Sequence, residues 1–252
     1  MPRTDTNAVN NFDVLAPVYD ELVAWAPYEL WIENLLQDLK RFGLTDEDVI
    51  LDAACGTGLS TLPLLHRGFE VIGVDSSSEM LALAREKVEK DERNLNARFY
   101  QARLSSMSLS HVFDAAICMH SGLDYILTFE GLMGAVDQIR SHLRTGALFA
   151  FDKCLDTEGF WRKTRIDRRN LTGGNAVLNY SWDRGSKIFT QHCYITFTDE
   201  HGHEKKIDVT HKMLAVTVEE LIDGLKDCGF EVLKPPEEFC VSDPGMGIFR
   251  AV

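Results

Sequence analysis

The stretch Val49-Ile-Leu-Asp-Ala-Ala-Cys-Gly-Thr-Gly58 decides the fold of this chain of 252 residues. It is a short apolar run that ends in an acid and leads into a turn with two glycines, and residues 59–65 can then form a helix. A strand, a glycine-bearing turn and a helix in this order are the opening unit of a nucleotide-binding α/β domain. Gly56 and Gly58 have no Cβ atom, so the backbone of the turn can pass close to a ligand.

A second buried strand follows, and its last residue is also an acid. The run Val71-Ile-Gly-Val-Asp75 ends 23 positions after Asp52. A carboxylate at the tip of the second strand can accept hydrogen bonds from both hydroxyls of a ribose. The turn lacks the lysine of a phosphate-binding P-loop, and Thr61 stands where a dinucleotide fingerprint has its third glycine. The two commonest nucleotide-binding turns are therefore disfavoured.

The remaining pattern, Asp-x-Ala-Cys-Gly-Thr-Gly with an acid 23 residues after its first position, resembles motif I of class I S-adenosylmethionine (SAM)-dependent methyltransferases. The resemblance covers most of the chain and implies SAM as the cofactor. It also implies an α/β fold with the Rossmann-like, seven-stranded sheet of that class. The residues that the resemblance assigns to the cofactor are Tyr19, Asp52, Ala53, Cys55, Gly56, Thr57, Gly58, Asp75, Ser76, Met80, Ala102, Arg103, Leu104 and Met119.

One position departs from the pattern of that family. After the third strand the family usually has Gly-Asp-Met or Gly-Asp-Leu, whose acid takes the adenine amino group, and this chain has Ala102-Arg103-Leu104. Arginine cannot accept a hydrogen bond. Either backbone atoms and another acceptor hold the adenine, or Arg103 turns outward, or the affinity for the cofactor is reduced.

Alternating apolar strands and amphipathic helices predict the core, with a helix over 128–143 and a fifth strand over 146–152. The alternation then breaks, and three runs with strand periodicity predict an inserted antiparallel meander of three strands. We therefore divide the chain into a SAM-binding core with an N-terminal helical cap (1–152), an inserted β lid (153–212) and the C-terminal part of the core (213–252). The last part is expected to supply a helix and a closing antiparallel hairpin.

A meander at this point resembles a subgroup of class I methyltransferases that act on small molecules. The subgroup includes amino-sugar N,N-dimethyltransferases and glycine N-methyltransferase-like enzymes, and residues 118–128 are similar to its segment after the fourth strand. In these enzymes the inserted sheet covers the substrate pocket, so the resemblance implies a small-molecule substrate. We expect residues 11–28 and the meander to close over the site, since both lie outside the αβ alternation and carry aromatic side chains.

Tyr19 and His120 are the candidate catalytic residues. A Tyr-Asp pair before the first core helix resembles the N-terminal cap of many small-molecule methyltransferases, in which the tyrosine reaches over the cofactor near the reactive methyl. Among the eight histidines, His120 is the best placed to take a proton at neutral pH, because it follows the fourth predicted strand; alternatively it only shapes the pocket. His120, Tyr125 and Trp161 are the candidate substrate-binding residues. Methyl transfer from a sulfonium needs no metal, and we expect none.

Composition narrows the partners and the compartment. With 39 acidic residues against 26 lysines and arginines, the net charge is −13, which disfavours binding to nucleic acid or to an anionic membrane. The N-terminal residues lack the apolar core of a signal peptide, no apolar run reaches membrane-spanning length, and six scattered cysteines fit reduced thiols. We expect a cytoplasmic protein, and a homodimer is compatible with the sequence.

These observations favour a SAM-dependent methyltransferase that methylates a nitrogen or an oxygen of a small molecule. One alternative is a nucleotide-cofactor oxidoreductase of the NAD type, against which the missing third glycine counts. A second alternative is a non-catalytic regulatory or interaction protein with the SAM-binding fold, for which Arg103 is the motive.

Overall fold

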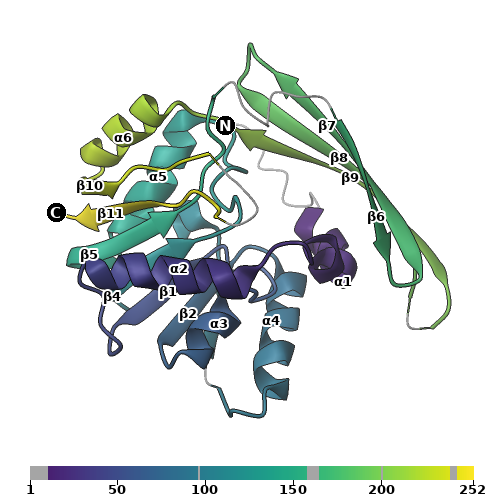
Figure 1. Ribbon diagram of the computed structural model, residues 1–252, viewed down its shortest axis with the longest axis horizontal. Coiled ribbons are helices and arrows are strands. Elements are labelled where there is room, and N and C mark those ends of the chain that lie inside the picture. Colours follow the sequence, from purple (N-terminus) through teal and green to yellow (C-terminus); the bar gives the residue numbers. More distant parts are fainter. Residues whose placement is uncertain (1–10, 96, 158–164, 200, 239–242) are drawn as a thin grey trace, which may run out of the picture.

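The computed structural model describes residues 11–95, 97–157, 165–199, 201–238 and 243–252. Its centre is a seven-stranded sheet with the strand order β10-β11-β5-β4-β1-β2-β3 (Figure 1). Neighbouring strands are parallel except at β11, which runs antiparallel to both β5 and β10. This topology confirms the predicted Rossmann-like, seven-stranded α/β sheet and its closing hairpin. The strands are β1 (Val49–Ala53), β2 (Glu70–Asp75), β3 (Ala97–Gln101), β4 (Phe113–Cys118), β5 (Leu143–Phe151), β10 (Phe230–Lys234) and β11 (Gly247–Ala251).

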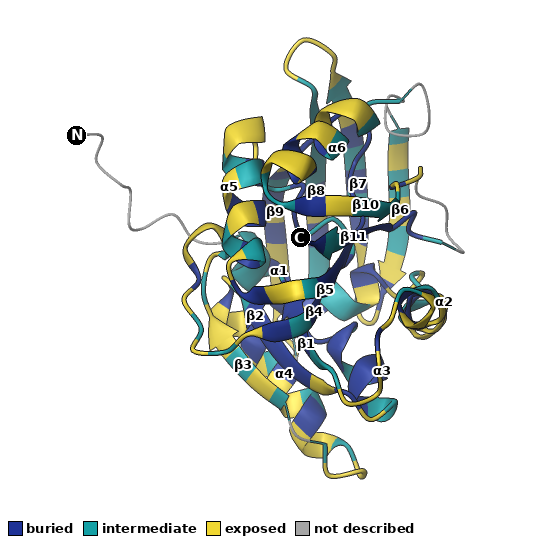
Figure 2. Ribbon diagram, turned by 90° about the vertical axis from the view of Figure 1, so that its left-hand side faces the viewer, coloured by how far each residue is buried: buried dark blue, intermediate teal, exposed yellow. Residues whose placement is uncertain are grey.

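Helices cover both faces of this sheet, so its central strands are apolar on both sides. In β1, the neighbouring residues Ile50 and Leu51 are both fully buried, and they belong to the cores on opposite faces. Figure 2 shows buried residues along the central strands, beneath helices whose outer surfaces are exposed. The helices on the face of Ile50 are α2 (Tyr28–Arg41), α3 (Thr61–His66) and α4 (Ser78–Lys90). Those on the face of Leu51 are α5 (Phe129–Arg140) and α6 (Val218–Asp227).

Two helix ends illustrate how local sequence sets the boundaries. The predicted capping box at the start of α6 is present, with Thr217 and Glu220 each accepting from the other's backbone N–H. The end of α5 differs from the prediction, because the helix stops at Arg140 and Leu143 is the first residue of β5. The spacing from Ile139 to Leu143 is helical, but Leu143 is buried as a strand residue instead.

The inserted segment forms a separate antiparallel sheet with the order β6-β7-β8-β9. It therefore has four strands rather than the predicted three. The missed strand, β6, reads Arg165-Ile-Asp-Arg-Arg-Asn-Leu171, and its charged residues hide the apolar alternation by which strands are recognised. The strands are β6 (Arg165–Leu171), β7 (Gly174–Asp183), β8 (Ile188–Thr198) and β9 (Glu204–Leu214).

Helix α1 (Asn11–Leu22) lies between this second sheet and the core (Figure 1). Its apolar residues pack against the inner face of β7, β8 and β9. Polar contacts hold both of its ends to the sheet. Asn11 Nδ2 donates to the Thr210 carbonyl at 2.8 Å, and the Thr172 N–H donates to Glu21 Oε2 at 2.5 Å. The second sheet and α1 thus form one layer over the carboxyl edge of the large sheet.

No helix in the part of the chain that the structure describes is long and apolar enough to span a bilayer. Within the same residues, no group of three or more His, Cys, Asp and Glu side chains is arranged to hold a metal ion.

Candidate active site

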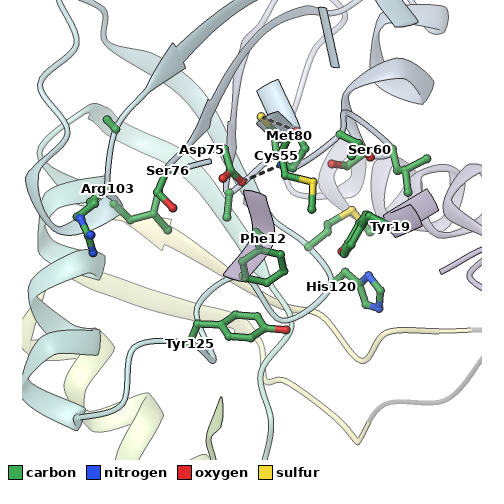
Figure 3. A pocket seen from close by; sticks show the side chains of 18 of the residues that line it. Phe12, Tyr19, Cys55, Ser60, Asp75, Ser76, Met80, Arg103, His120 and Tyr125 are labelled. Atoms are coloured by element: carbon green, nitrogen blue, oxygen red, sulfur yellow. Dashed lines mark hydrogen bonds between the residues drawn. The ribbon is translucent and has the colours of Figure 1, made fainter. Parts of the chain in front are cut away.

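A cavity of about 240 Å³ lies at the carboxyl edge of the parallel strands, where open α/β sheets bind their ligands. Its walls are the turn after β1, the tip of β2, the loops after β3 and β4, and α1 (Figure 3). Figure 3 shows Arg103 at one end of the cavity and Tyr19 and His120 at the other. The predicted site residues that line the cavity are Tyr19, Cys55, Gly56, Thr57, Asp75, Ser76, Met80, Ala102, Arg103, Leu104, Met119, His120 and Tyr125.

Three of the described predicted site residues do not line the wall. Asp52 and Ala53 are fully buried in β1, and Gly58 lies behind the turn. Trp161 lies outside the described residues.

Asp52 supports the wall from beneath. Its Oδ2 accepts hydrogen bonds from Ser60 Oγ at 2.8 Å and from Thr61 Oγ1 at 2.6 Å, which ties β1 to the start of α3. Burial raises the pKa of Asp52 to about 6, against the opposing effect of these two hydroxyls. The acid of the motif therefore fixes the turn on which the wall residues lie.

The two glycines of the turn serve different purposes. Both have a left-handed φ, +54° at Gly56 and +80° at Gly58. A Cβ atom on Gly56 would meet nothing within 4 Å, so this position faces open space at the cavity. A Cβ atom on Gly58 would lie 3.3 Å from the Cβ of Ala84 in α4. Gly58 therefore permits close packing against a helix, and only Gly56 fits the predicted reason, close approach to a ligand.

Asp75 is the acid on the cavity wall, and neighbouring N–H groups fix its orientation. Its Oδ2 accepts from the Gly56 N–H at 2.9 Å, and its Oδ1 accepts from the Ser77 N–H at 2.8 Å. Burial raises the pKa of Asp75, and these backbone donors oppose the rise. A carboxylate has about four acceptor sites, and the Ser76 N–H is a third donor to this group, so acceptor capacity remains for a hydroxyl of a bound ligand.

Helix α1 is fastened directly to the glycine turn. Thr57 Oγ1 donates to Asp20 Oδ1 at 2.6 Å, and Lys87 of α4 forms an ion pair with Asp20 while donating to the Thr57 carbonyl at 3.0 Å. Two turns earlier in α1, Asp13 Oδ1 accepts a hydrogen bond from Ser77 Oγ at 2.5 Å. The Tyr-Asp pair in the sequence thus combines an anchor, Asp20, with a side chain held in the cavity, Tyr19.

Arg103 has an exposed side chain at the rim of the cavity. It precedes a short 3-10 helix, η1 (Leu104–Ser106), and the neighbouring wall is made by Ala102, Leu104 and Ser105. The backbone of Ala102 is held by its N–H, which donates to the Asp75 carbonyl at 2.9 Å.

At the other end of the cavity, Tyr28 joins Tyr19 to His120. Tyr28 Oη and His120 Nδ1 are 2.6 Å apart, and the hydroxyls of Tyr28 and Tyr19 are also hydrogen-bonded. A hydroxyl has one proton, so the Tyr28 hydroxyl donates in one of these two hydrogen bonds and accepts in the other, and the imidazole tautomer decides which. Burial, helped by the positive charge of Arg169, lowers the pKa of His120 to about 4. His120 is therefore uncharged at neutral pH.

The backbone at His120 is held in an uncommon conformation. His120 and Ser121 have φ values of +59° and +68°, which non-glycine residues rarely adopt. Asp152, which follows β5, stabilises this turn. Its Oδ2 accepts from the Ser121 N–H at 2.8 Å, and the carboxylate also accepts from the His120 N–H. The imidazole is further enclosed by the rings of Trp25, Tyr28 and Trp31, with ring centroids 5.6 to 5.9 Å away.

Sequence reasoning missed Phe12, Tyr28 and Asp152 as parts of the site. Tyr28 follows the three- and four-residue spacing of an apolar helix face, so it was indistinguishable from a core residue. Asp152 follows an apolar run, as Asp52 and Asp75 do, and this shared pattern could have indicated that it belongs to the site.

A second cavity, of about 560 Å³, lies between α1 and the inner face of the β6–β9 sheet. It shares Phe12, Tyr19, His120 and Tyr125 with the first cavity. Phe12 and Tyr125 pack edge to face with ring centroids 4.9 Å apart. The two cavities thus meet at the end of the first cavity where Tyr19 and His120 lie.

Asp152 gives a prediction on pH and stability. Burial and the charge of Asp124 raise the pKa of Asp152 to about 7 from an ordinary 3.8. Because the folded state holds this proton more tightly than the unfolded state does, Asp152 lowers the free energy of unfolding as pH rises from about 4 to 7. In Asp152→Asn protein, this contribution to the fall in the free energy of unfolding should be absent. The difference from the wild type is on the order of 4 kcal/mol, at 1.36 kcal/mol per pKa unit.

Urea unfolding of both proteins between pH 4 and pH 8 measures this difference. His120 and His211, whose pKa values burial lowers to about 4, give the opposite slope but are common to both proteins. Asp223→Asn, at an exposed position of α6, is the matched control. Parallel curves for the wild type and Asp152→Asn contradict the assignment.

The cavities fit SAM on two observations. The carboxylate of Asp75 stands in the cavity wall with acceptor capacity left for a ribose, beside a glycine turn that is open toward the cavity. The first cavity also borders a second cavity at the end where Tyr19 and His120 lie, as a transfer reaction between two bound molecules requires.

Comparisons with known proteins agree with this geometry. The family model described as "Methyltransferase domain" matches residues 50–146, which include the glycine turn and Asp75. The dTDP-3-amino-3,6-dideoxy-α-D-glucopyranose N,N-dimethyltransferase of Streptomyces fradiae is 31% identical over 209 residues, which are 81% of this chain and 76% of that protein. The YqeM protein of Bacillus subtilis (strain 168) is 28% identical over 236 residues, 91% of this chain and 90% of YqeM.

Among solved structures, a S-adenosylmethionine-dependent methyltransferase from Clostridium acetobutylicum ATCC 824 superposes with a TM-score of 0.78 at 21% identity. The match covers 96% of this chain and 99% of that one, so the whole fold is shared, including the inserted sheet. The glycine turn, the topology of the sheet and the similarity to these relatives lead to one conclusion. The chain belongs to the SAM-dependent methyltransferases, and SAM is its cofactor.

Proposed function

We propose that this protein transfers the methyl group of SAM to an amine nitrogen of a small molecule held beneath the β6–β9 sheet. The observation that carries the proposal is the second cavity, which meets the cofactor cavity at Tyr19 and His120. Its volume of about 560 Å³ lies within the roughly 300–1,000 Å³ of small-molecule sites. A cavity of this size suits a metabolite better than a nucleic acid or a protein.

Two considerations favour nitrogen over oxygen as the acceptor. The relative from Streptomyces fradiae is named as an N,N-dimethyltransferase. In addition, His120 is a weak base, because its pKa is lowered to about 4. An alcohol needs strong help to lose its proton, whereas a neutral amine can attack with its lone pair and release a proton afterwards.

The residues of this chain have separable roles in the proposal. Bound SAM would supply an activated methyl group on a sulfonium. Its transfer to the amine would form a C–N bond and break the C–S bond, with the bonding electrons left on sulfur and a proton released from the methylated nitrogen. Asp75 and the glycine turn bind the ribose, and Tyr19, Tyr28 and His120 orient the acceptor. Such positioning can supply about 7–11 kcal/mol of the barrier reduction.

The proposal includes a cytoplasmic location and the absence of nucleic-acid and membrane partners. It also includes the division of the chain into core (1–152), lid (153–212) and C-terminal core (213–252). Buried cysteine thiols support the location, and the net charge of −13 supports the absence of nucleic-acid and membrane partners. The separate four-stranded sheet supports the division of the chain. A homodimer stays a prediction, which sedimentation can test.

Methyl-labelled SAM and a fractionated cell extract test the proposal. Wild-type protein should transfer label to the low-molecular-weight amine fraction, and label should be absent from the nucleic-acid and protein fractions. Asp75→Ala protein serves as the control for cofactor-dependent transfer. Label found in nucleic acid or protein contradicts the proposal, and so does the absence of transfer to any fraction when SAM is bound.

A further inference from the structure

Strand β6 has an inverted pattern of side chains. Arg165, Asp167 and Arg169 face inward and line the second cavity, while Ile166, between them, faces solvent with 55% of its surface exposed. A sheet with one face on the core normally has the opposite pattern, with apolar residues inward and charges outward. Burying charges is costly unless they gain partners, so the inward charges need a reason other than packing.

The two arginines are held in place by contacts with the cavity wall. Arg169 Nη1 donates to the Leu22 carbonyl at the end of α1, and its guanidinium lies 5.6 Å from the ring centroid of Trp25. The guanidinium of Arg165 lies over the ring of Tyr180, 4.4 Å from its centroid. A guanidinium has five N–H donors, and the contact with Leu22 engages one nitrogen of Arg169. Both groups are thus oriented by the protein, and Arg169 has donors beyond the one that contacts Leu22.

The charge of the cavity wall is positive on balance. Among the described residues that line it, Arg165 and Arg169 are the cations and Asp167 is the anion. Asp167 pairs with Arg165 at 3.4 Å, which leaves Arg169 without a carboxylate among these lining residues. The two histidines of the wall, His120 and His211, are uncharged at neutral pH because burial lowers their pKa values to about 4. A positive cavity in a chain of net charge −13 is a local arrangement, not a consequence of composition.

We propose that the methyl acceptor carries an anionic group, a carboxylate or a phosphate, which Arg169 and Arg165 bind from β6. This inference rests on the proposed function and narrows its substrate class to amines that also carry an acid. Arginine suits this role because its planar fork of donors matches two oxygens of a carboxylate or phosphate.

The same charge also favours the reactive form of an amine. Arg169 already contributes to the lowered pKa of His120, so its field reaches the end of the cavity where the methyl acceptor would lie. A neighbouring positive charge disfavours protonation of an amine, which raises the fraction with a free lone pair. Arg169 would therefore bind one end of the acceptor and help to keep the other end neutral.

Calorimetric titration of the SAM-saturated protein with sodium phosphate, sodium acetate and ethylammonium chloride tests the inference. Phosphate and acetate should bind to the wild type, and ethylammonium should not. Arg169→Gln should weaken anion binding about tenfold or more, since it removes a charge-assisted contact. Arg168→Gln, one residue away on the exposed face of the same strand, should leave anion binding unchanged.

Two further variants separate recognition from structure. Arg165→Gln should also weaken anion binding, and it leaves the contact between Arg169 and Leu22 in place. Arg169→Lys keeps the charge and should restore part of the loss.

The titration has distinct outcomes for the two proposals. SAM binding without anion binding overturns this inference alone, as does an effect of Arg168→Gln equal to that of Arg169→Gln. Failure of the wild type to bind SAM overturns the proposed function itself.

Discussion

Asp75→Ala should weaken the binding of SAM by about 10- to 100-fold, because hydrogen bonds to a charged group contribute roughly 1.5–3 kcal/mol. The change removes the acceptor for the ribose hydroxyls. It also releases the Gly56 N–H, which Asp75 holds at 2.9 Å, and so loosens the turn that forms the cavity wall. Calorimetric titration with SAM measures the effect directly.

Glu70→Ala is the matched control for this experiment. Glu70 is the first residue of the same strand, and its carboxylate pairs with Arg98 at the exposed end of the sheet. Its loss should leave the affinity for SAM unchanged. Equal affinities of Asp75→Ala and the wild type would remove Asp75 from the binding site.

Tyr28→Phe should lower kcat by about 100-fold while changing SAM affinity little. The hydroxyl of Tyr28 holds both Tyr19 and His120, so its loss leaves two side chains at the junction of the cavities without their partner. A misplacement of about 1 Å in a transfer reaction can lower the rate about 10²-fold. Steady-state kinetics with a labelled-methyl assay give kcat, and Tyr100→Phe, at the exposed end of β3, is the control. Unchanged kcat in Tyr28→Phe contradicts the positioning role.

The companion variant His120→Asn distinguishes a base from an orienting residue. A general base contributes about 10²–10⁴-fold to the rate. With a pKa of about 4, His120 stays unprotonated from pH 5 upward, and its acidic limb cannot lie near neutrality. We therefore expect a loss of about tenfold or less and a pH profile of unchanged shape between pH 6 and 9. A loss of 10³-fold with a new profile would establish His120 as the base.

The core of the fold could be predicted because its signals are local. The strand that ends at Asp52, the glycine turn and the strand that ends at Asp75 are each recognisable within a dozen residues. Parallel strands place their carboxyl ends at one edge, so the cavity followed from the order of the elements. The residues from α1 could be anticipated only through the family resemblance of the Tyr-Asp pair.

The missed features depend on contacts between distant segments. β6 was overlooked because Arg165, Asp167 and Arg169 take the inward positions that apolar residues usually take, and a cavity rather than a core lies beneath them. Tyr28 follows a helical apolar spacing, and only its contact with His120, 92 residues away, distinguishes it from the core. Gly58 was assigned to ligand approach, but its neighbour is a helix whose position the sequence did not give.

The most direct test of the account is a crystal structure of the protein with S-adenosylhomocysteine. The account predicts that the ribose hydroxyls lie within 2.5–3.2 Å of the Asp75 carboxylate. It also predicts that the sulfur lies where the two cavities meet, beside Tyr19 and His120. A ligand bound elsewhere, or one whose ribose makes no contact with Asp75, would contradict it.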